Sequence, residues 1–259
     1  MSTNDNLLKA ERHHQIVDLV NQQGRTTVQE LSSQFGVSEA TVRRDLEELD
    51  GLGQLRRTHG GAVRAEKTSK EPPMMERIGE QPDEKARIGR AAASLIQNSE
   101  TIFLGSGTTV IEIARNLPQY INLTVITNSL PVVNELATHP GIELIVIGGM
   151  LRQSELSMVG HIAEQAVCEF RADRIFLGMH AIDAHSGFTS DFLPEVMTDR
   201  AIMSIGRQKV IVADHSKFDR ISSVLVAPIT SANVIITDSD APTDCIEQLM
   251  ELGVHVIAA

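Results

Sequence analysis

Short apolar runs alternate with helix-like stretches after residue 100, and no other feature of the chain restricts its fold as strongly. The runs suit strands that are buried on both faces, and the stretches between them have the spacing of amphipathic helices. This alternation is typical of a mainly parallel α/β sheet with helices on both faces. The expected strands are 101–104, 123–127, 142–147, 174–177, 210–213 and 234–237, and the expected helices are 84–97, 110–116, 130–137, 161–170 and 195–205.

The ends of the expected strands carry small polar and basic residues. Ligands of such sheets bind beyond the carboxyl ends of the strands. The first strand is followed by residues 105–109 (GSGTT), which contain no lysine and so differ from a Walker nucleotide loop. Such a loop can hold a phosphate through its hydroxyls and the amides of the next helix, although many are only turns. Later strands end near Asn128, Arg152 and Lys217. Together these ends predict an anion-binding site.

The first 65 residues contain three short helical patterns. The first has an apolar stripe that includes Ile16 and Val20. The second begins after Thr27, with Glu30 at the spacing of a capping box. A short glycine turn then leads to Ser38, a good N-cap for the third helix. Helix, short turn and helix is the arrangement that lays its second member in the major groove of DNA.

Two short strands are expected after the third helix, at residues 53–58 and 62–64, and would form a basic wing. An arginine pair on a helix is often only a solvated face, and His59 is open to two interpretations, a phosphate contact or a turn residue. The three helices, the polar first turn and the wing together nevertheless predict binding to double-stranded DNA. The expected DNA contacts are Ser38, Thr41, Arg43, Arg44, Arg56, Arg57, His59 and Gly60.

The net charge of −11 does not by itself favour a DNA partner. Acidic and basic side chains nearly balance in residues 1–65, however, so most of the negative charge lies in the rest of the chain. Five arginines fall between positions 43 and 64. A basic patch on a nearly neutral module is compatible with contacts to DNA phosphates.

Composition limits the remaining classes of function. Aromatic residues make up only 3% of the chain, which argues against stacking of single-stranded bases. Cys168 and Cys245 lie far apart and offer no metal-ligand spacing, so we expect neither a metal nor a cofactor, and a reducing compartment. We find no signal peptide and no apolar run long enough for a membrane span, and therefore expect a cytoplasmic protein without membrane contact.

A change in composition marks the expected domain boundary. Residues 66–83 combine charged residues with three prolines and a glycine, which is typical of a linker. The predicted organisation is a winged helix-turn-helix domain in residues 1–65, a linker in residues 66–83 and a larger α/β effector domain in residues 84–259.

Several motifs resemble a known family. Residues 37–46 (VSEATVRRDL) and 55–62 (LRRTHGGA) closely resemble the DNA-binding signature of the DeoR family of bacterial regulators. The larger domain also resembles its DeoR counterpart, at residues 107–109, 127–129, 148–149, 176–178, 182–183 and 214–218. The resemblance implies a fold similar to ribose-5-phosphate isomerase and coenzyme A transferases, operator binding as a repressor of a sugar-catabolic operon, and a phosphorylated sugar as effector.

The resemblance also implies roles for single residues. Ser106, Thr108, Thr109 and Lys217 would hold the phosphate of the effector. Candidates for binding sugar hydroxyls or for supporting the pocket are Asn128, Arg152, Asp183 and Glu195. An aspartate commonly stands at the position of Gly105 in this family, so its loss bears on which sugar binds. The expected effector-binding residues are Gly105, Ser106, Gly107, Thr108, Thr109, Asn128, Arg152, Asp183, Glu195 and Lys217.

The alternative is an active sugar-phosphate isomerase with a DNA-binding appendage. Isomerisation needs a carboxylate base beside the substrate carbon. The isomerases have an acid-rich turn after the strand that matches 174–177, whereas this chain keeps only Asp183 there, with Glu195 as a second candidate. We favour a regulator that has the pocket without the chemistry. We expect a homo-oligomer, dimer or tetramer, that sets two recognition helices on matching half-sites, with the effector shifting their placement.

Overall fold

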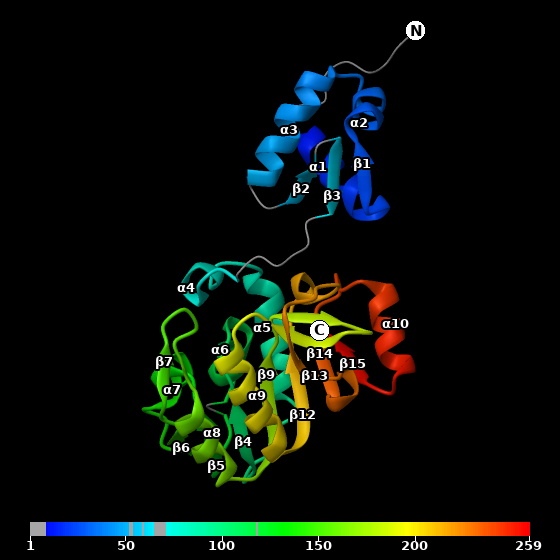
Figure 1. The fold of residues 1–259 in the computed structure, drawn as a ribbon. Coiled ribbons are helices and arrows are strands. Elements are labelled where there is room, and N and C mark those ends of the chain that lie inside the picture. The colour runs from blue at the N-terminus through cyan, green and yellow to red at the C-terminus, as the bar shows by residue number, and fades with distance from the viewer. Residues whose placement is uncertain (1–8, 52–53, 59, 65–70, 118) are drawn as a thin grey trace. The chain divides into compact units, whose positions relative to one another are not determined.

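A computed structural model of the chain describes residues 9–51, 54–58, 60–64, 71–117 and 119–259 (Figure 1). The chain divides into two compact units, Met1–Ser69 and Lys70–Ala259, called unit 1 and unit 2 below. Each unit has an apolar core of its own. Among the described residues, no helix is both long and apolar enough to cross a membrane.

Unit 1 is a winged helix-turn-helix. Its helices are α1 (Lys9–Gln23), α2 (Val28–Phe35) and α3 (Glu39–Gly51), and its strands are β1 (Arg25–Thr27), β2 (Leu55–Thr58) and β3 (Gly61–Arg64). The strands form an antiparallel sheet in the order β1-β3-β2. The three predicted helices and the two wing strands are confirmed. Strand β1 is an addition, since its three residues (RTT) give no strand pattern in the sequence.

Local sequence signals fix the boundaries of α2. The Glu30 amide donates to Thr27 Oγ1 at 3.2 Å, and the Thr27 amide donates to Glu30 Oε2 at 2.7 Å, so the predicted capping box is complete. The helix ends at Gly36, whose φ is 65°. Apolar side chains of all three helices and of the wing close the core of the unit, namely Ile16, Val20, Val28, Leu31, Val42, Leu46, Leu49, Leu55 and Ala62.

Unit 2 is built on a seven-stranded sheet in the order β15-β14-β12-β9-β4-β5-β6, in which every neighbouring pair is parallel. Its strands are β4 (Thr101–Leu104), β5 (Leu123–Thr127), β6 (Ile142–Val146), β9 (Ala172–Gly178), β12 (Gly206–Val212), β14 (Val234–Thr237) and β15 (His255–Ala258). The main helices are α5 (Pro82–Ala93), α6 (Thr108–Arg115), α7 (Leu130–Leu136), α8 (His161–Cys168), α9 (Leu193–Ile205) and α10 (Thr243–Glu251).

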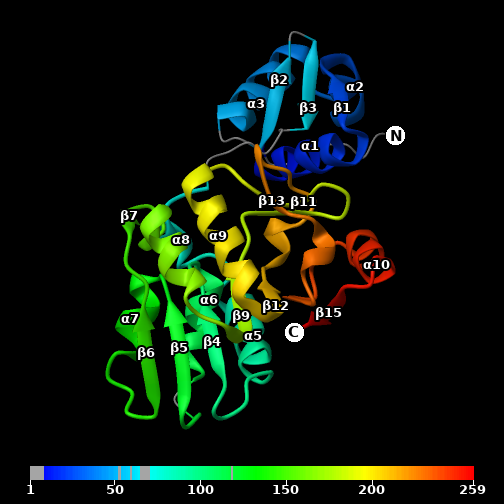
Figure 2. The same cartoon turned by 60° about the horizontal axis from the view of Figure 1, so that its bottom comes forward.

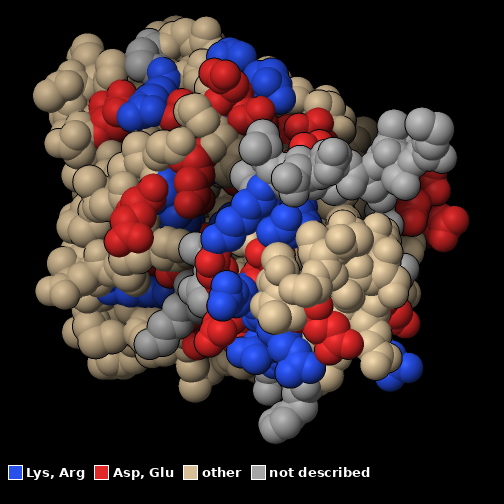
Figure 3. All heavy atoms as spheres, turned by 90° about the horizontal axis from the view of Figure 1, so that it is seen from above, with Lys and Arg blue, Asp and Glu red and all other residues tan. Residues whose placement is uncertain are grey.

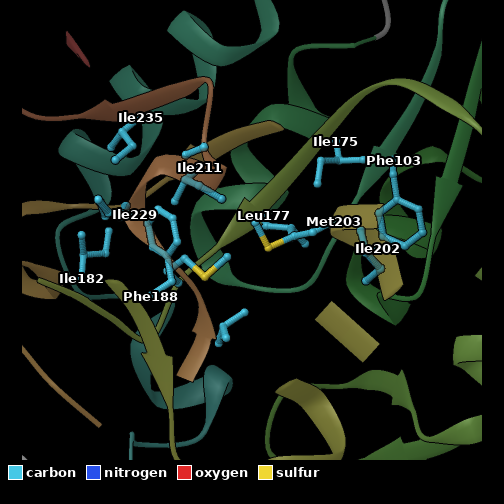
Figure 4. Close-up of a cluster of buried hydrophobic side chains, with 14 of the residues drawn as sticks. Phe103, Ile175, Leu177, Ile182, Phe188, Ile202, Met203, Ile211, Ile229 and Ile235 are labelled. Atoms are coloured by element: carbon cyan, nitrogen blue, oxygen red, sulfur yellow. The ribbon is translucent and has the colours of Figure 1, made fainter. Parts of the chain in front are cut away.

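Helices cover both faces of this sheet (Figure 2). On one face, α5, α6 and α7 pack on alternate strand residues such as Leu104 and Phe176. On the other face, α8, α9 and α10 pack on their neighbours in the strands. Figure 4 shows this second cluster, with Phe103, Ile175 and Ile211 among its members. Residues buried on both sides explain why the strands are continuous apolar runs in the sequence.

Smaller elements complete unit 2. They are a hairpin of β7 (Met150–Arg152) and β8 (Ser157–Val159), a sheet of β10 (Ala181–Asp183), β11 (Gly187–Ser190) and β13 (Val224–Ala227), the helix α4 (Met74–Arg77), and the 3-10 turns η1 (His215–Lys217) and η2 (Ile229–Ser231). These elements, together with α10 and β15, were not predicted from the sequence. The added strands are only three or four residues long, which is too short to show a period in the sequence.

The predicted fold class is confirmed: a winged helix-turn-helix and a mainly parallel α/β domain. All six predicted strands and all five predicted helices are present, with shifted ends. The predicted linker is shorter in the structure, because residues 71–83 pack in unit 2. Met74 is fully buried, and its amide donates to the Ser154 carbonyl at 2.8 Å. Because it contains two adjacent prolines, this segment has the composition of a linker, although it packs against the rest of unit 2.

Candidate functional site

The first turn of α3 presents polar and basic side chains. Ser38 caps the helix, since the Thr41 amide donates to Ser38 Oγ at 3.2 Å. Arg43 and Arg44 are exposed, and Arg43 Nη2 lies 3.2 Å from Glu39 Oε2 on the same helix. A pair of exposed arginines on the second helix of a helix-turn-helix is suited to contacts with bases or phosphates.

Asp45 fixes the position of this helix. Its carboxylate is buried and accepts hydrogen bonds from Arg12 Nε at 2.7 Å and His13 Nε2 at 3.0 Å, both on α1. Burial would raise the pKa of Asp45, but the hydrogen bonds from Arg12 and His13 hold it below its ordinary value. Asp45, which directly follows Arg43 and Arg44 in the helix, therefore faces α1.

The wing is tied to α3 by a second aspartate. The Arg57 amide donates to Asp50 Oδ1 at 3.1 Å, and Arg57 Nη1 lies 3.8 Å from Glu47 Oε2. Gly60 is exposed and its carbonyl accepts from the Val28 amide. Of the other predicted DNA contacts, His59 and the side chain of Arg56 lie outside the described parts of the chain. Figure 3 shows Lys and Arg side chains in small groups beside Asp and Glu on one face of the molecule.

A cavity of unit 2 lies where the strand order reverses. From β4 the chain runs outward through β5 and β6, and then returns to β9 on the other side of β4. Such a switch point leaves a crevice at the carboxyl ends of the two central strands. A cavity of about 50 Å³ opens there, lined by residues 106–109 after β4, residues 177–180 at the end of β9, and Lys217 of η1.

The loop after β4 is shaped for close approach to a ligand. Gly107 is the N-cap of α6 and has φ of 117°, a conformation that side chains rarely adopt. Thr108 and Thr109 follow in the first turn of the helix, and both are buried. The first amides of a helix have no partner within it and carry partial positive charge. The loop therefore offers amides and two hydroxyls to an anion.

Two aspartates position Lys217, which also lines this cavity. Asp214 Oδ1 accepts from the Ser216 amide at 3.0 Å. Asp238 accepts from the His215 amide at 2.7 Å and from His215 Nδ1 at 3.0 Å. Both carboxylates thus hold the backbone of η1, and Lys217 extends from it into the cavity.

A carboxylate already stands among the cations of the cavity. Glu71 forms an ion pair with Lys217, accepts from His180 Nδ1 at 2.7 Å and lies 2.9 Å from Arg77 Nη1. Its side chain is only 12% exposed. Burial would raise the pKa of Glu71, but the hydrogen bond from His180 and the charges of Lys217 and Arg77 lower it to about 2. Glu71 is therefore ionised throughout the neutral range.

Acidic side chains also line the cavity. Glu195 and Asp199 lie one turn apart on α9, and Glu155 joins them in the lining. Arg152 pairs with Glu195, and its guanidinium lies 4.5 Å from the centre of the Phe192 ring. Burial raises the pKa of Glu195 to about 7, and burial together with the charge of Glu195 raises the pKa of Asp199. Glu195 and Asp199 therefore offer the cavity carboxyl groups that can accept or donate hydrogen bonds.

Comparison with known families identifies both units. Residues 12–68 match the DeoR-like helix-turn-helix domain, and residues 80–239 match the DeoR C terminal sensor domain. This chain belongs to the DeoR family. The family predicted from the sequence motifs is thus confirmed, and the chain is a DNA-binding transcription regulator with a sensor domain.

Relatives of this DeoR-family chain are similar over nearly their full length. The glycerol-3-phosphate regulon repressor of Escherichia coli is 35% identical over 94% of this chain and 96% of its own. The transcriptional repressor AccR of Agrobacterium fabrum is 36% identical over 90% and 91%. Among solved structures, ribose 5-phosphate isomerase A from Methanocaldococcus jannaschii has a TM-score of 0.40 and 16% identity, over 54% of this chain and 55% of that one.

Six of the ten predicted effector residues of the DeoR-family chain line the cavity, namely Ser106, Gly107, Thr108, Thr109, Glu195 and Lys217. Gly105, Asn128, Arg152 and Asp183 do not line it. Asn128 Nδ2 donates to the Met158 carbonyl, and Arg152 forms an ion pair with Glu195. Asp183 Oδ1 accepts from the amides of His185 and Ser186, so this carboxylate holds the β10–β11 turn.

The absence of a side chain at Gly105 has a structural reason. A Cβ atom there would lie 2.5 Å from Leu177 Cδ2 and 3.3 Å from the Phe176 carbonyl oxygen. The glycine therefore lets β4 end close against β9. An aspartate at this position would require Leu177 to move.

The lining also includes polar residues that the sequence did not single out, namely Glu71, Arg77, Glu155, His180, Ser190 and Asp199. Two of them had a signal. His180 follows the end of β9, and Asp199 lies four residues after the predicted Glu195, on the same face of its helix. Glu71 and Arg77 lie in the predicted linker, where composition concealed them.

Proposed function

We propose that this DeoR-family chain is a repressor of a carbohydrate-catabolic operon and that a phosphorylated sugar controls its affinity for the operator. The observation that carries the proposal is the polar cavity at the switch point between β4 and β9. Its lining combines the hydroxyls and amides of residues 106–109 and the Lys217 side chain with the carboxyl groups of α9. A sugar phosphate has matching groups, namely one anion and several hydroxyls.

The phosphate would bind at the first turn of α6. Ser106, Thr108 and Thr109 supply hydroxyls, the helix start supplies amides, and Lys217 supplies a positive charge. The sugar hydroxyls would then lie toward Glu195 and Asp199. Carboxyl groups are good partners there because each can bind more than one hydroxyl. Arg152 would position Glu195 through their ion pair.

The DNA would be bound by unit 1. Ser38, Thr41, Arg43 and Arg44 would reach the major groove from α3. The wing residues Arg56, Arg57, His59 and Gly60 would contact the phosphate backbone. A homo-oligomer, dimer or tetramer, would place two copies of α3 on matching half-sites, and a coupling of about 1–3 kcal/mol would change operator affinity roughly 5- to 150-fold.

The isomerase alternative is not favoured. Of its two candidate bases, Asp183 is engaged by two amides of a turn and does not line the cavity, whereas Glu195 lines the cavity and is paired with Arg152. The relatives named above are repressors. We therefore propose a binding pocket without turnover.

A DNA-shift assay on the promoter region beside the gene tests the proposal, repeated with a panel of sugar phosphates. We expect a specific shift that one compound changes. A specific shift that no compound alters would contradict the effector half of the proposal. Turnover of a sugar phosphate by the purified protein, without a specific shift, would support the isomerase instead.

A further inference from the structure

We propose that Glu71 is a tethered competitor of the effector, whose carboxylate occupies the anion position until the phosphate displaces it. The inference rests on the proposed function and concerns the regulation of the same cavity. It also adds His180 and Arg77 to the groups that the phosphate would contact.

The contacts of Glu71 resemble those of a bound anion. Lys217, His180 and Arg77 come from three separate parts of unit 2, after β12, after β9 and in α4, and all meet on this one carboxylate. The Glu71 side chain lines the same cavity as residues 106–109. Two cationic side chains and a histidine thus meet beside the start of α6.

A phosphate is the stronger ligand for such a site. A phosphate monoester carries about −1.5 to −2 charge at pH 7 and presents three acceptor oxygens. Glu71 carries one negative charge and two oxygens. The phosphate can therefore engage Lys217 and the hydroxyls of Thr108 and Thr109 together, whereas the carboxylate is held on its own segment of chain.

Displacement of Glu71 need not dismantle the cavity. Arg77 has a second carboxylate partner, since its Nη2 lies 2.5 Å from Glu155 Oε2, and its Nε donates to the Pro72 carbonyl at 2.7 Å. Both Arg77 and Glu155 are buried. Arg77 would remain anchored after Glu71 leaves, so the cation site persists and becomes available to the effector.

The position of Glu71 in the chain links the cavity to the DNA-binding unit. Residues 65–70 alone separate it from Arg64, the last residue of wing strand β3. Pro72 and Pro73 follow Glu71, and proline restricts the backbone on both sides. Release of the carboxylate would therefore move the first residues of unit 2, to which the chain of unit 1 is connected. This gives the effector a direct route to operator affinity.

Calorimetric titration of the full chain with inorganic phosphate and with glycerol 3-phosphate tests the competition. The proteins compared are the wild type, Glu71→Gln, and the control Glu76→Gln, whose side chain is exposed on α4. We expect Glu71→Gln to bind both probes at least roughly tenfold more tightly, because an apparent dissociation constant is the intrinsic one divided by the fraction of competent molecules. Glu76→Gln should match the wild type.

Equal or weaker binding by Glu71→Gln, in a protein whose circular dichroism matches the wild type, would overturn the proposal. Glu71→Ala provides a second test if the glutamine variant does not fold. The outcomes also separate this inference from the proposed function. If inorganic phosphate binds none of the three proteins, the anion site and the proposed function both fail. If phosphate binds the wild type and Glu71→Gln equally, only the competition fails.

A second measurement checks the route to DNA. Without any effector, Glu71→Gln should change operator affinity in the direction in which the effector changes it in the wild type. Unchanged operator affinity in this variant, together with a normal response of the wild type to its effector, would contradict the proposed link between release of Glu71 and operator affinity.

Discussion

Asp45 on α3 and Arg12 on α1 form a hydrogen-bonded ion pair at 2.7 Å, with side chains only 3% and 11% exposed. The pair joins the recognition helix to the first helix of unit 1. Because removal of one partner leaves the other as an unpaired, mostly buried charge, Asp45→Ala should destabilise unit 1 by about 3 kcal/mol. Urea unfolding followed by circular dichroism measures this loss.

The matched control for Asp45→Ala is Glu48→Ala on the same helix. Glu48 pairs with Lys9 of α1, but the two side chains are 50% and 57% exposed. Exposed pairs contribute about 0–1 kcal/mol, so this variant should unfold close to the wild type. Similar losses in the two variants would show that the Asp45 pair has no special role.

Arg44→Ala should weaken operator binding. If Arg44 reads a guanine, its loss costs about 1–3 kcal/mol and relaxes specificity at one base pair. Titration of operator fragments in the gel-shift assay gives both quantities, with Arg207→Ala, an exposed arginine of unit 2, as the control. Operator affinity equal to that of the wild type would remove Arg44 from the DNA contacts.

The sequence was most informative where the physical signal is local. The capping box of Thr27 and Glu30 needs only two side chains and their own backbone, and it is present as predicted. The central strands are equally visible, because burial on both faces leaves runs such as residues 101–104. The place of the GSGTT loop in the cavity was also predictable, because the carboxyl ends of parallel strands share one edge of the sheet.

The rest of the site depends on tertiary contacts. Glu71 and Lys217 are separated by 146 positions in the chain, and no spacing rule links them. Asp183 was expected in the cavity, but its carboxylate is used by the amides of its own turn, which is a common role for aspartate. Gly105 is explained by its approach to Leu177 on a neighbouring strand, which only the fold reveals.

Lys217→Ala should abolish the response to the effector, whereas the protein should still bind the operator. Lys217 lies in unit 2 and supplies a positive charge to the proposed phosphate site, whereas the backbone of η1 is held independently of this side chain by Asp214 and Asp238. The gel-shift assay with the effector measures both properties in one experiment. A variant that still responds at wild-type effector concentrations would refute the role of Lys217.

Asp199→Leu should weaken the binding of a sugar phosphate without weakening the binding of inorganic phosphate. Leucine has a similar size but cannot bind a hydroxyl, so the affinity for a sugar phosphate should fall by the value of one hydrogen bond, about 0.5–1.5 kcal/mol. Inorganic phosphate has no sugar hydroxyls, and its binding should be unchanged. Calorimetry with both ligands gives the comparison. An equal loss for the two ligands would indicate a general disturbance of the cavity.

The depressed pKa of Glu71 predicts how stability depends on pH. The ordinary value is 4.5 and the value in the folded protein is about 2, so the folded state favours the ionised form. Its contribution to stability is complete above pH 4.5 and is lost as the pH falls toward 2. Glu71→Gln cannot titrate. The difference in unfolding free energy between the wild type and this variant should therefore narrow by about 2 kcal/mol between pH 6 and pH 3. Urea unfolding at intermediate pH values measures the difference. The control Glu76→Gln should show no such narrowing. A difference that stays constant across this range would mean that Lys217, Arg77 and His180 do not hold Glu71 in solution.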